Sequence, residues 1–227
     1  MDRSGTRMTR RLLLRAAVVG AGCTLFVSGA GSAHDVAQQT MPDAHQHLAH
    51  AEHQHAAMPD TAPGAYARAV HSYTVPDVTL VDQNAKPVRL RELLAADEPV
   101  MMNFIFTTCT AICPVMTKIF SNVPQQLGTA AGRLRMISIS IDPENDTPQQ
   151  LKAYAGKFDA GPRWQFLTGS VENVATVQRA FGTYNSDKMS HEPLTLLRSA
   201  PGKSWVRIDG FASPEDLARE YQKVAQR

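Results

Sequence analysis

The sequence predicts an α/β sandwich, in which helices cover both faces of one central mixed sheet. A continuous apolar run at 99–106 lacks the alternation of a half-exposed strand and therefore indicates a strand that is buried on both faces, and the stretch 133–142 predicts another buried strand. Stretches with helix-start signals follow these runs, and alternation of strand and helix is typical of a layered α/β domain. The chain has 227 residues, of which 43% are hydrophobic, and this is enough for one core plus extensions.

The first half of the domain begins with a predicted β-hairpin. Residues 73–94 indicate a strand, a polar turn at 82–84, a second strand and a short helix. The buried run 99–106 comes next and predicts a central strand. A helix should follow from about 111 to 126, because Pro114 then falls in its first turn, where proline is tolerated.

The second half predicts two more strand–helix units and a closing hairpin with its helix. Thr147 and Ser213 are each followed by proline, which is the pattern of a helix cap with proline at the first helical position. The predicted elements are a strand at 133–142, a helix at 148–158, a strand at 163–169, a helix at 170–182, strands at 193–199 and 204–212, and a helix at 214–226.

The first 33 residues predict an export signal or an N-terminal anchor. A basic segment precedes an apolar run at 16–30, and small residues at 31–33 suit a cleavage site. The run is shorter than the roughly 20 residues of a membrane span. TRRLLLR at 9–15 resembles a twin-arginine export motif. Lipidation at Cys23 and an uncleaved anchor are alternatives, and every version places the domain in the periplasm or on the outer face of the inner membrane.

Residues 34–72 predict a disordered linker, because they lack the large aliphatic residues that a core needs. Histidine and methionine are concentrated in this linker: His45, His47, His50, His53, His55, Met41 and Met58. Imidazole suits copper, nickel and zinc, while thioether sulfur favours Cu(I), so the tract predicts a weak secondary metal site. The alternative is a solvated linker whose histidines bind nothing. The folded domain is expected at 73–227.

Cys109 and Cys113 stand where the first buried strand leads into its helix. Sites in open α/β sheets lie beyond the carboxyl ends of the strands, and a helix N-terminus favours the thiolate. Residues four apart on a helix have Cβ atoms about 5–6 Å apart, whereas a disulfide needs roughly 3.8 Å. Because Cys109 precedes the helix, the pair can close to a disulfide or stay open around an ion. Two inert buried cysteines are the alternative.

A metal held by two thiolates needs another ligand, and His191 is the candidate. It follows all other histidines and lies in a loop before the strand opened by Pro193, which is expected beside 99–106. Two thiolates and one imidazole form a soft set that favours Cu(I) and accepts Cu(II), whereas zinc would require a fourth ligand. A satisfied surface or core histidine is the alternative. The net charge of +2 gives no electrostatic case for nucleic-acid binding.

The segments FIFTTCTAICPVM, ISISIDPENDTPQQL and SHEP resemble the Sco/SenC family of thioredoxin-fold copper proteins over about residues 72–225. The resemblance implies a thioredoxin-like fold with an N-terminal β-hairpin extension. It also implies copper bound by Cys109, Cys113 and His191, and a cis peptide bond before Pro193 that would aim the His191 ring at the sulfurs.

By the same resemblance the partner is a copper-accepting protein such as the copper-site subunit of cytochrome c oxidase. Thr110-Ala111 stand where many members have Pro-Asp, which leaves another copper protein open as the partner. Two functions follow: a copper metallochaperone, or a thiol-disulfide oxidoreductase that reduces the cysteines of a partner's copper site with Cys109 and Cys113.

Overall fold

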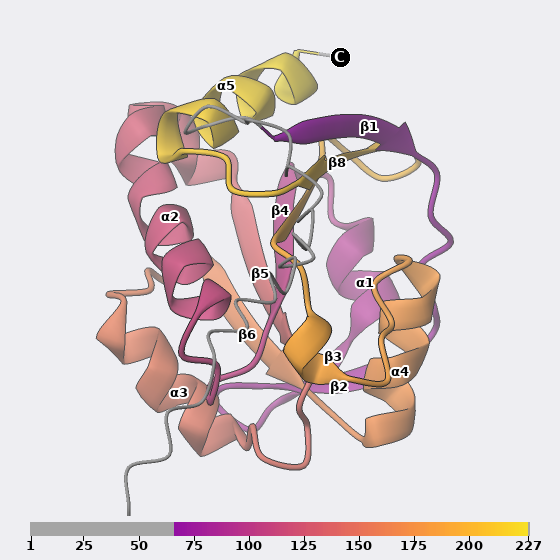
Figure 1. The fold of residues 1–227 in the computed structure, drawn as a ribbon. Helices are drawn as coiled ribbons and strands as arrows, with labels where there is room; N and C mark the ends of the chain where they lie inside the picture. Colours follow the sequence, from indigo (N-terminus) through magenta and orange to yellow (C-terminus); the bar gives the residue numbers. More distant parts are fainter. Residues whose placement is uncertain (1–65, 227) are drawn as a thin grey trace, which may run out of the picture. The chain divides into compact units, whose positions relative to one another are not determined.

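A computed structural model describes residues 66–226 and contains one eight-stranded mixed sheet (Figure 1). The order of the strands across the sheet is β1-β8-β7-β4-β5-β6-β2-β3. The strands are β1 (Ala67–His71), β2 (Thr79–Asp82), β3 (Pro87–Arg89), β4 (Val100–Ile105), β5 (Arg135–Ser140), β6 (Trp164–Thr168), β7 (Leu194–Arg198) and β8 (Trp205–Asp209).

Helices cover both faces of this sheet, as the sequence predicts. In Figure 1, α2, α3 and α5 lie to the left and α1 and α4 to the right. A separate hydrophobic cluster fills each side. The helices are α1 (Leu90–Ala95), α2 (Ile112–Leu127), α3 (Pro148–Lys157), α4 (Val171–Ala180) and α5 (Pro214–Ala225), with 3-10 turns η1 (Gly128–Arg133) and η2 (Lys188–Ser190). Within 66–226, no helix has the length and apolar character that a membrane crossing requires.

The central position of β4 confirms the reading of its continuous apolar run. All six residues of β4 are buried, and the strand pairs parallel with β5 and antiparallel with β7. Both predicted caps are also present. Thr147 accepts a hydrogen bond from the Gln150 N–H, and Ser213 accepts one from the Asp216 N–H, each within a reciprocal capping box.

The predicted hairpin is formed by β2 and β3 and extends the sheet at one edge through an antiparallel contact with β6. Its turn is stabilised by the carboxylate of Asp82, which accepts hydrogen bonds from the N–H groups of Asn84 and Lys86. At the other edge, β1 pairs with β8 in antiparallel register.

Strand β1 requires a correction, because residues 67–71 fall inside the predicted linker 34–72. Four of the five β1 residues are exposed and none is fully buried, so this edge strand has no hydrophobic alternation to reveal it. Backbone pairing with β8 forms it instead. Residues 34–65 and the predicted export signal at 1–33 lie outside the described residues, so those predictions stay predictions.

Candidate metal centre

The two cysteines lie in the turn that joins β4 to α2. The Cys109 N–H donates to the Phe106 carbonyl oxygen over 3.2 Å, which turns the chain at the end of the central strand. Cys113 is in the first turn of α2. The side chains belong to the core cluster on the α2 face, but Cys109 retains 8% of its accessible surface and Cys113 only 1%. Cys109 is therefore the cysteine nearer to solvent.

The sulfur of Cys109 takes part in the start of α2. The Ala111 side chain makes no capping hydrogen bond, so the first N–H groups of the helix need another acceptor. The Cys113 N–H donates to the Cys109 Sγ over 3.4 Å. Both cysteines are free thiols in this structure. The contact places the two residues side by side, at the position that the sequence predicts for the pair.

The surroundings separate the pKa values of the two thiols. Burial disfavours the Cys109 thiolate, but N–H groups of Cys113, Ala111 and Ile112 point at its sulfur and outweigh that effect, so the pKa of Cys109 lies below its ordinary value. Burial raises the pKa of Cys113 to about 12, although a hydrogen bond with the Phe106 backbone opposes this rise. Cys109 is thus the readier thiolate.

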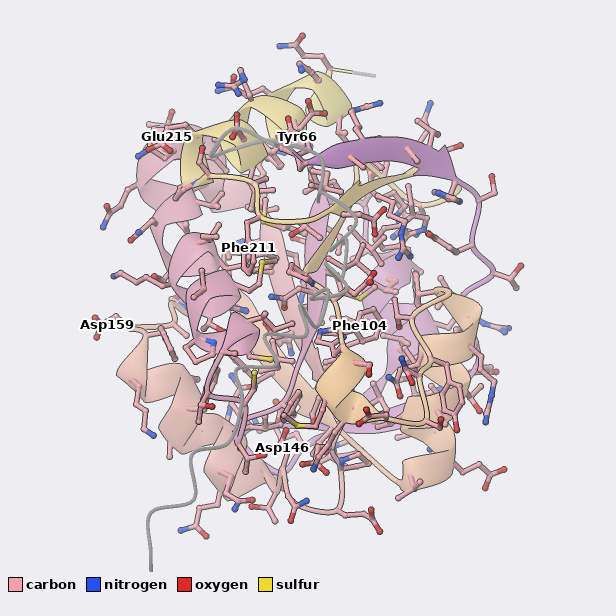
Figure 2. The ribbon with its side chains drawn as sticks, in the orientation of Figure 1. Tyr66, Phe104, Asp146, Asp159, Phe211 and Glu215 are labelled. Carbon is pink, nitrogen blue, oxygen red and sulfur yellow. The ribbon has the colours of Figure 1, made fainter. Side chains whose placement is uncertain are left out.

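Asp146 connects the cysteine turn to the segment after β5. Its carboxylate is fully buried and accepts hydrogen bonds from the Thr107 N–H at 3.1 Å, the Thr107 hydroxyl at 2.5 Å and the Ser140 hydroxyl at 2.6 Å. Figure 2 labels Phe104 on the central strand and Asp146 below it, in the loop between β5 and α3. Asp146 lies in the motif ISISIDPENDTPQQL, whose sequence predicts no role for this residue.

Asp142, in the same segment, contacts the turn that precedes His191. Its Oδ2 lies 2.6 Å from the Nζ of Lys188, and Asn145 donates to the same carboxylate at 3.0 Å. No sequence pattern predicts a role for Lys188. A lysine in a polar loop carries no local sequence signal of its partner, because the contact spans 46 positions of the chain.

His191 lies at the end of the central strand. Its Nε2 donates to the Phe104 carbonyl oxygen over 2.9 Å. Burial lowers the pKa of His191, and the Phe104 contact opposes this shift without reversing it. A histidine that binds a metal usually donates its other ring N–H to a carbonyl or carboxylate, which fixes the tautomer. In the neutral ring of His191, Nδ1 is the nitrogen with a free lone pair.

The structure does not bring the three predicted ligands together. Among residues 66–226, no three His, Cys, Asp or Glu side chains converge as a metal cluster. Cys109 contacts Cys113, while His191 contacts β4. The predicted secondary site at Met41–Met58 lies outside the described residues.

The predicted cis bond before Pro193 is wrong. No peptide bond is cis in the described part of the chain, so Glu192–Pro193 is trans. The Pro193 carbonyl accepts a hydrogen bond from the Gly210 N–H over 2.9 Å, which continues the pairing of β7 with β8. The hydrogen bond to Phe104, rather than a sharp turn at the proline, orients the His191 ring.

Comparison with known proteins decides the family. The sequence model of SCO1/SenC matches residues 67–226. The chain belongs to the SCO1/SenC family. It is 39% identical over 99 residues to the SCO1 protein homolog of Bacillus subtilis, a match that covers 43% of this chain and 50% of that relative. The chain thus spans about half the length of that curated relative.

Solved Sco structures share the fold. The copper-bound structure of ScoI from Bradyrhizobium japonicum has 27% identity and a TM-score of 0.55, over 72% of this chain and 99% of that one. A structure of BsSco, described with a disulfide switch, has 29% identity and a TM-score of 0.58, over 68% and 94% of the two chains. The predicted thioredoxin-like α/β fold is confirmed by these neighbours, and copper is confirmed as a metal that a Sco homologue binds.

The predicted ligands are chemically suited to the same metal. Two adjacent sulfurs at a helix N-terminus and an imidazole with one free nitrogen are soft or borderline ligands, which suit Cu(I) and accept Cu(II). A zinc site would call for a fourth ligand.

Proposed function

We propose that this Sco protein is a metallochaperone that holds copper through Cys109, Cys113 and His191 and delivers it to another protein. The contact between the Cys113 N–H and the Cys109 Sγ carries the proposal, because it sets two sulfurs side by side where N–H groups favour thiolate. The hydrogen bond from His191 to Phe104 supports the third ligand, since it leaves Nδ1 for the metal.

The acceptor in this proposal is a copper site such as that of cytochrome c oxidase. The related BsSco is described as a member of the Sco family of cytochrome c oxidase assembly proteins. The chain acts outside the cytoplasm, in the periplasm or on the outer face of the inner membrane, with residues 1–33 as an export signal or anchor and the twin-arginine route as the export path. The histidine and methionine residues between Met41 and Met58 form a weaker copper store.

A second candidate function is thiol-disulfide exchange with the partner's copper-site cysteines. The different exposure and pKa of the two cysteines favour it. The Cys109 thiolate would attack a partner disulfide, forming a mixed disulfide and releasing one partner thiolate. Cys113 would then attack the Cys109 sulfur and release the second partner thiolate. The partner disulfide is reduced by two electrons, and Cys109 and Cys113 end as a disulfide.

Copper stoichiometry tests the first function. The reduced protein should bind one tight equivalent of Cu(I) at the domain site, and X-ray absorption should show sulfur ligation. Cys109→Ser and Cys113→Ser should each remove that site. His191→Ala should remove a nitrogen ligand from the Cu(II) form, as measured by electron paramagnetic resonance. Tight binding that survives both cysteine substitutions would exclude this ligand set.

A further inference from the structure

The segment that carries His191 forms a turn with its own hydrogen bonds. Asp187 accepts bonds from the Met189 N–H at 2.9 Å and from the Ser190 hydroxyl at 3.0 Å. The His191 N–H donates to the Lys188 carbonyl oxygen over 3.2 Å. The backbones of Lys188 and His191 are therefore joined directly across the turn η2.

The side chain of Lys188 connects this turn to two other segments, the loop after β5 and the end of β4 that leads into the cysteine turn. Its Nζ lies 2.6 Å from Oδ2 of Asp142, whose side chain is only 6% exposed. The same ammonium lies 5.6 Å from the centre of the Phe106 ring, within the range of a cation–π contact. Phe106 supplies the carbonyl oxygen that accepts the Cys109 N–H.

The segment between β5 and α3, which carries Asp142 and Asp146, thus contacts both the turn that holds the cysteines and the turn that precedes His191. Asp146 accepts hydrogen bonds from Thr107 in the cysteine turn. Asp142 pairs with Lys188 in the histidine turn. The backbone N–H of Asp142 donates to the Ser140 hydroxyl, which itself donates to the Asp146 carboxylate, so the backbone of Asp142 is hydrogen-bonded to the network around Asp146.

We infer that Lys188 is a positioning residue for His191, because its ion pair with Asp142 ties the turn that carries His191 to the segment that is hydrogen-bonded to the cysteine turn. The inference rests on the proposed copper function. It predicts unequal effects on the two oxidation states. Soft thiolates select Cu(I), whereas Cu(II) prefers tetragonal sites with nitrogen or oxygen ligands and so depends more on the imidazole.

The test compares Cu(I) and Cu(II) binding by the full chain and its variants. Lys188→Met keeps the aliphatic stem and removes the charge. We expect it to weaken Cu(II) binding about 10-fold, the lower end of the effect of residues that orient metal ligands. Its Cu(II) electron paramagnetic resonance spectrum should also lose the coupling to the His191 ring nitrogen. Its Cu(I) affinity should change less than threefold. Lys188→Arg should restore the wild-type spectrum.

Two further variants make the result specific. Lys203→Met removes the same charge from the exposed turn between β7 and β8, and its Cu(II) affinity should equal that of the wild type. This turn follows the end of β7 that pairs with Val100, at the start of β4, so it lies away from His191. In an Asp142→Asn background, Lys188→Met should cause little further loss, because the ion pair is already absent.

The outcomes separate this inference from the proposed function. Wild-type protein that binds no copper through its cysteines would overturn both. If the wild type binds copper but Lys188→Met binds Cu(II) equally or more tightly, or loses Cu(I) and Cu(II) to the same extent, only the positioning role fails. The far-ultraviolet circular dichroism spectrum of each variant must match that of the wild type. If Lys188→Met loses Cu(II) affinity because it unfolds, and Lys188→Arg does not restore that affinity, the result also counts against the positioning role.

Discussion

The His191 ring donates from Nε2 to the Phe104 carbonyl oxygen over 2.9 Å, which joins the turn before β7 to the central strand β4. A carbonyl oxygen only accepts, so the contact fixes the proton on Nε2. Burial lowers the pKa of the ring, and a neutral ring keeps a lone pair on Nδ1. In the proposed copper site, Nδ1 is therefore the ring nitrogen that would bind the metal.

This arrangement predicts the tautomer and the pH dependence of His191. In metal-free protein labelled with ¹⁵N, the ring should be the Nε2-protonated form, and Cu(I) should shift the Nδ1 resonance most. Because the folded-state pKa is lowered, protonation displaces the neutral ring only at a pH below the ordinary value for histidine. An Nδ1-protonated ring, or one that titrates above that value, would contradict the contact with Phe104.

The two cysteines should differ in their reaction with iodoacetamide. The thiolate is the reactive form, so Cys109 should be alkylated first at neutral pH, and its rate should level off once the pH exceeds its lowered pKa. Cys113 should stay slow and accelerate only toward pH 12. Mass spectrometry of the Cys113→Ala and Cys109→Ala variants measures each rate alone. Faster alkylation of Cys113 at pH 7.5 would show that the assignment of the two roles is reversed.

Sequence patterns predicted those parts of the fold whose signal is local. The apolar run of β4 identified the central strand, and the caps Thr147 and Ser213 located two helix starts to the residue. Strand β1 was missed because backbone pairing, rather than a buried face, forms it.

The candidate site was predicted as residue types but not as a geometry. The adjacency of Cys109 and Cys113 followed from their spacing on one turn. The contact of Lys188 with Asp142 depends on how two distant loops meet across the sheet, which no local pattern encodes. The bond before Pro193 is trans, whereas the resemblance to thioredoxin-fold proteins implied a cis bond.

Oxidation should abolish Cu(I) binding at the domain site. A disulfide between Cys109 and Cys113 removes both thiolates at once, and reduction should restore them. Mass spectrometry after alkylation, with and without reductant, reports the bond, and a Cu(I) competition assay reports the metal. The Cys109→Ser variant is the control for the mass spectrometry, since it cannot form the disulfide. Unchanged Cu(I) affinity in the oxidised protein would rule out both cysteines as ligands.

Removal of the N-terminal histidine and methionine residues should separate two classes of copper site. A chain that starts at Tyr66 lacks the five histidines and two methionines of the tract from Met41 to Met58. It should lose the weaker copper equivalents and keep one tight Cu(I) equivalent, because Cys109, Cys113 and His191 remain. Equilibrium dialysis with metal analysis measures the totals. If the total stoichiometry is unchanged by the truncation, the tract stores no copper.

Asp146 should contribute more to stability than any exposed residue of the same loop. Its buried carboxylate accepts hydrogen bonds from Thr107 and Ser140, and Asp146→Ala leaves the Thr107 N–H without that acceptor. Hydrogen bonds to a charged group and the cost of an unpaired buried donor together suggest a loss of about 3 kcal/mol in the free energy of unfolding. Urea denaturation of the reduced, metal-free protein measures this loss.

The control is Glu144→Ala, at an exposed position in the same loop, whose free energy of unfolding should stay within about 0.5 kcal/mol of the wild type. Equal effects of the two substitutions would mean that the hydrogen bonds of Asp146 do not stabilise the cysteine turn.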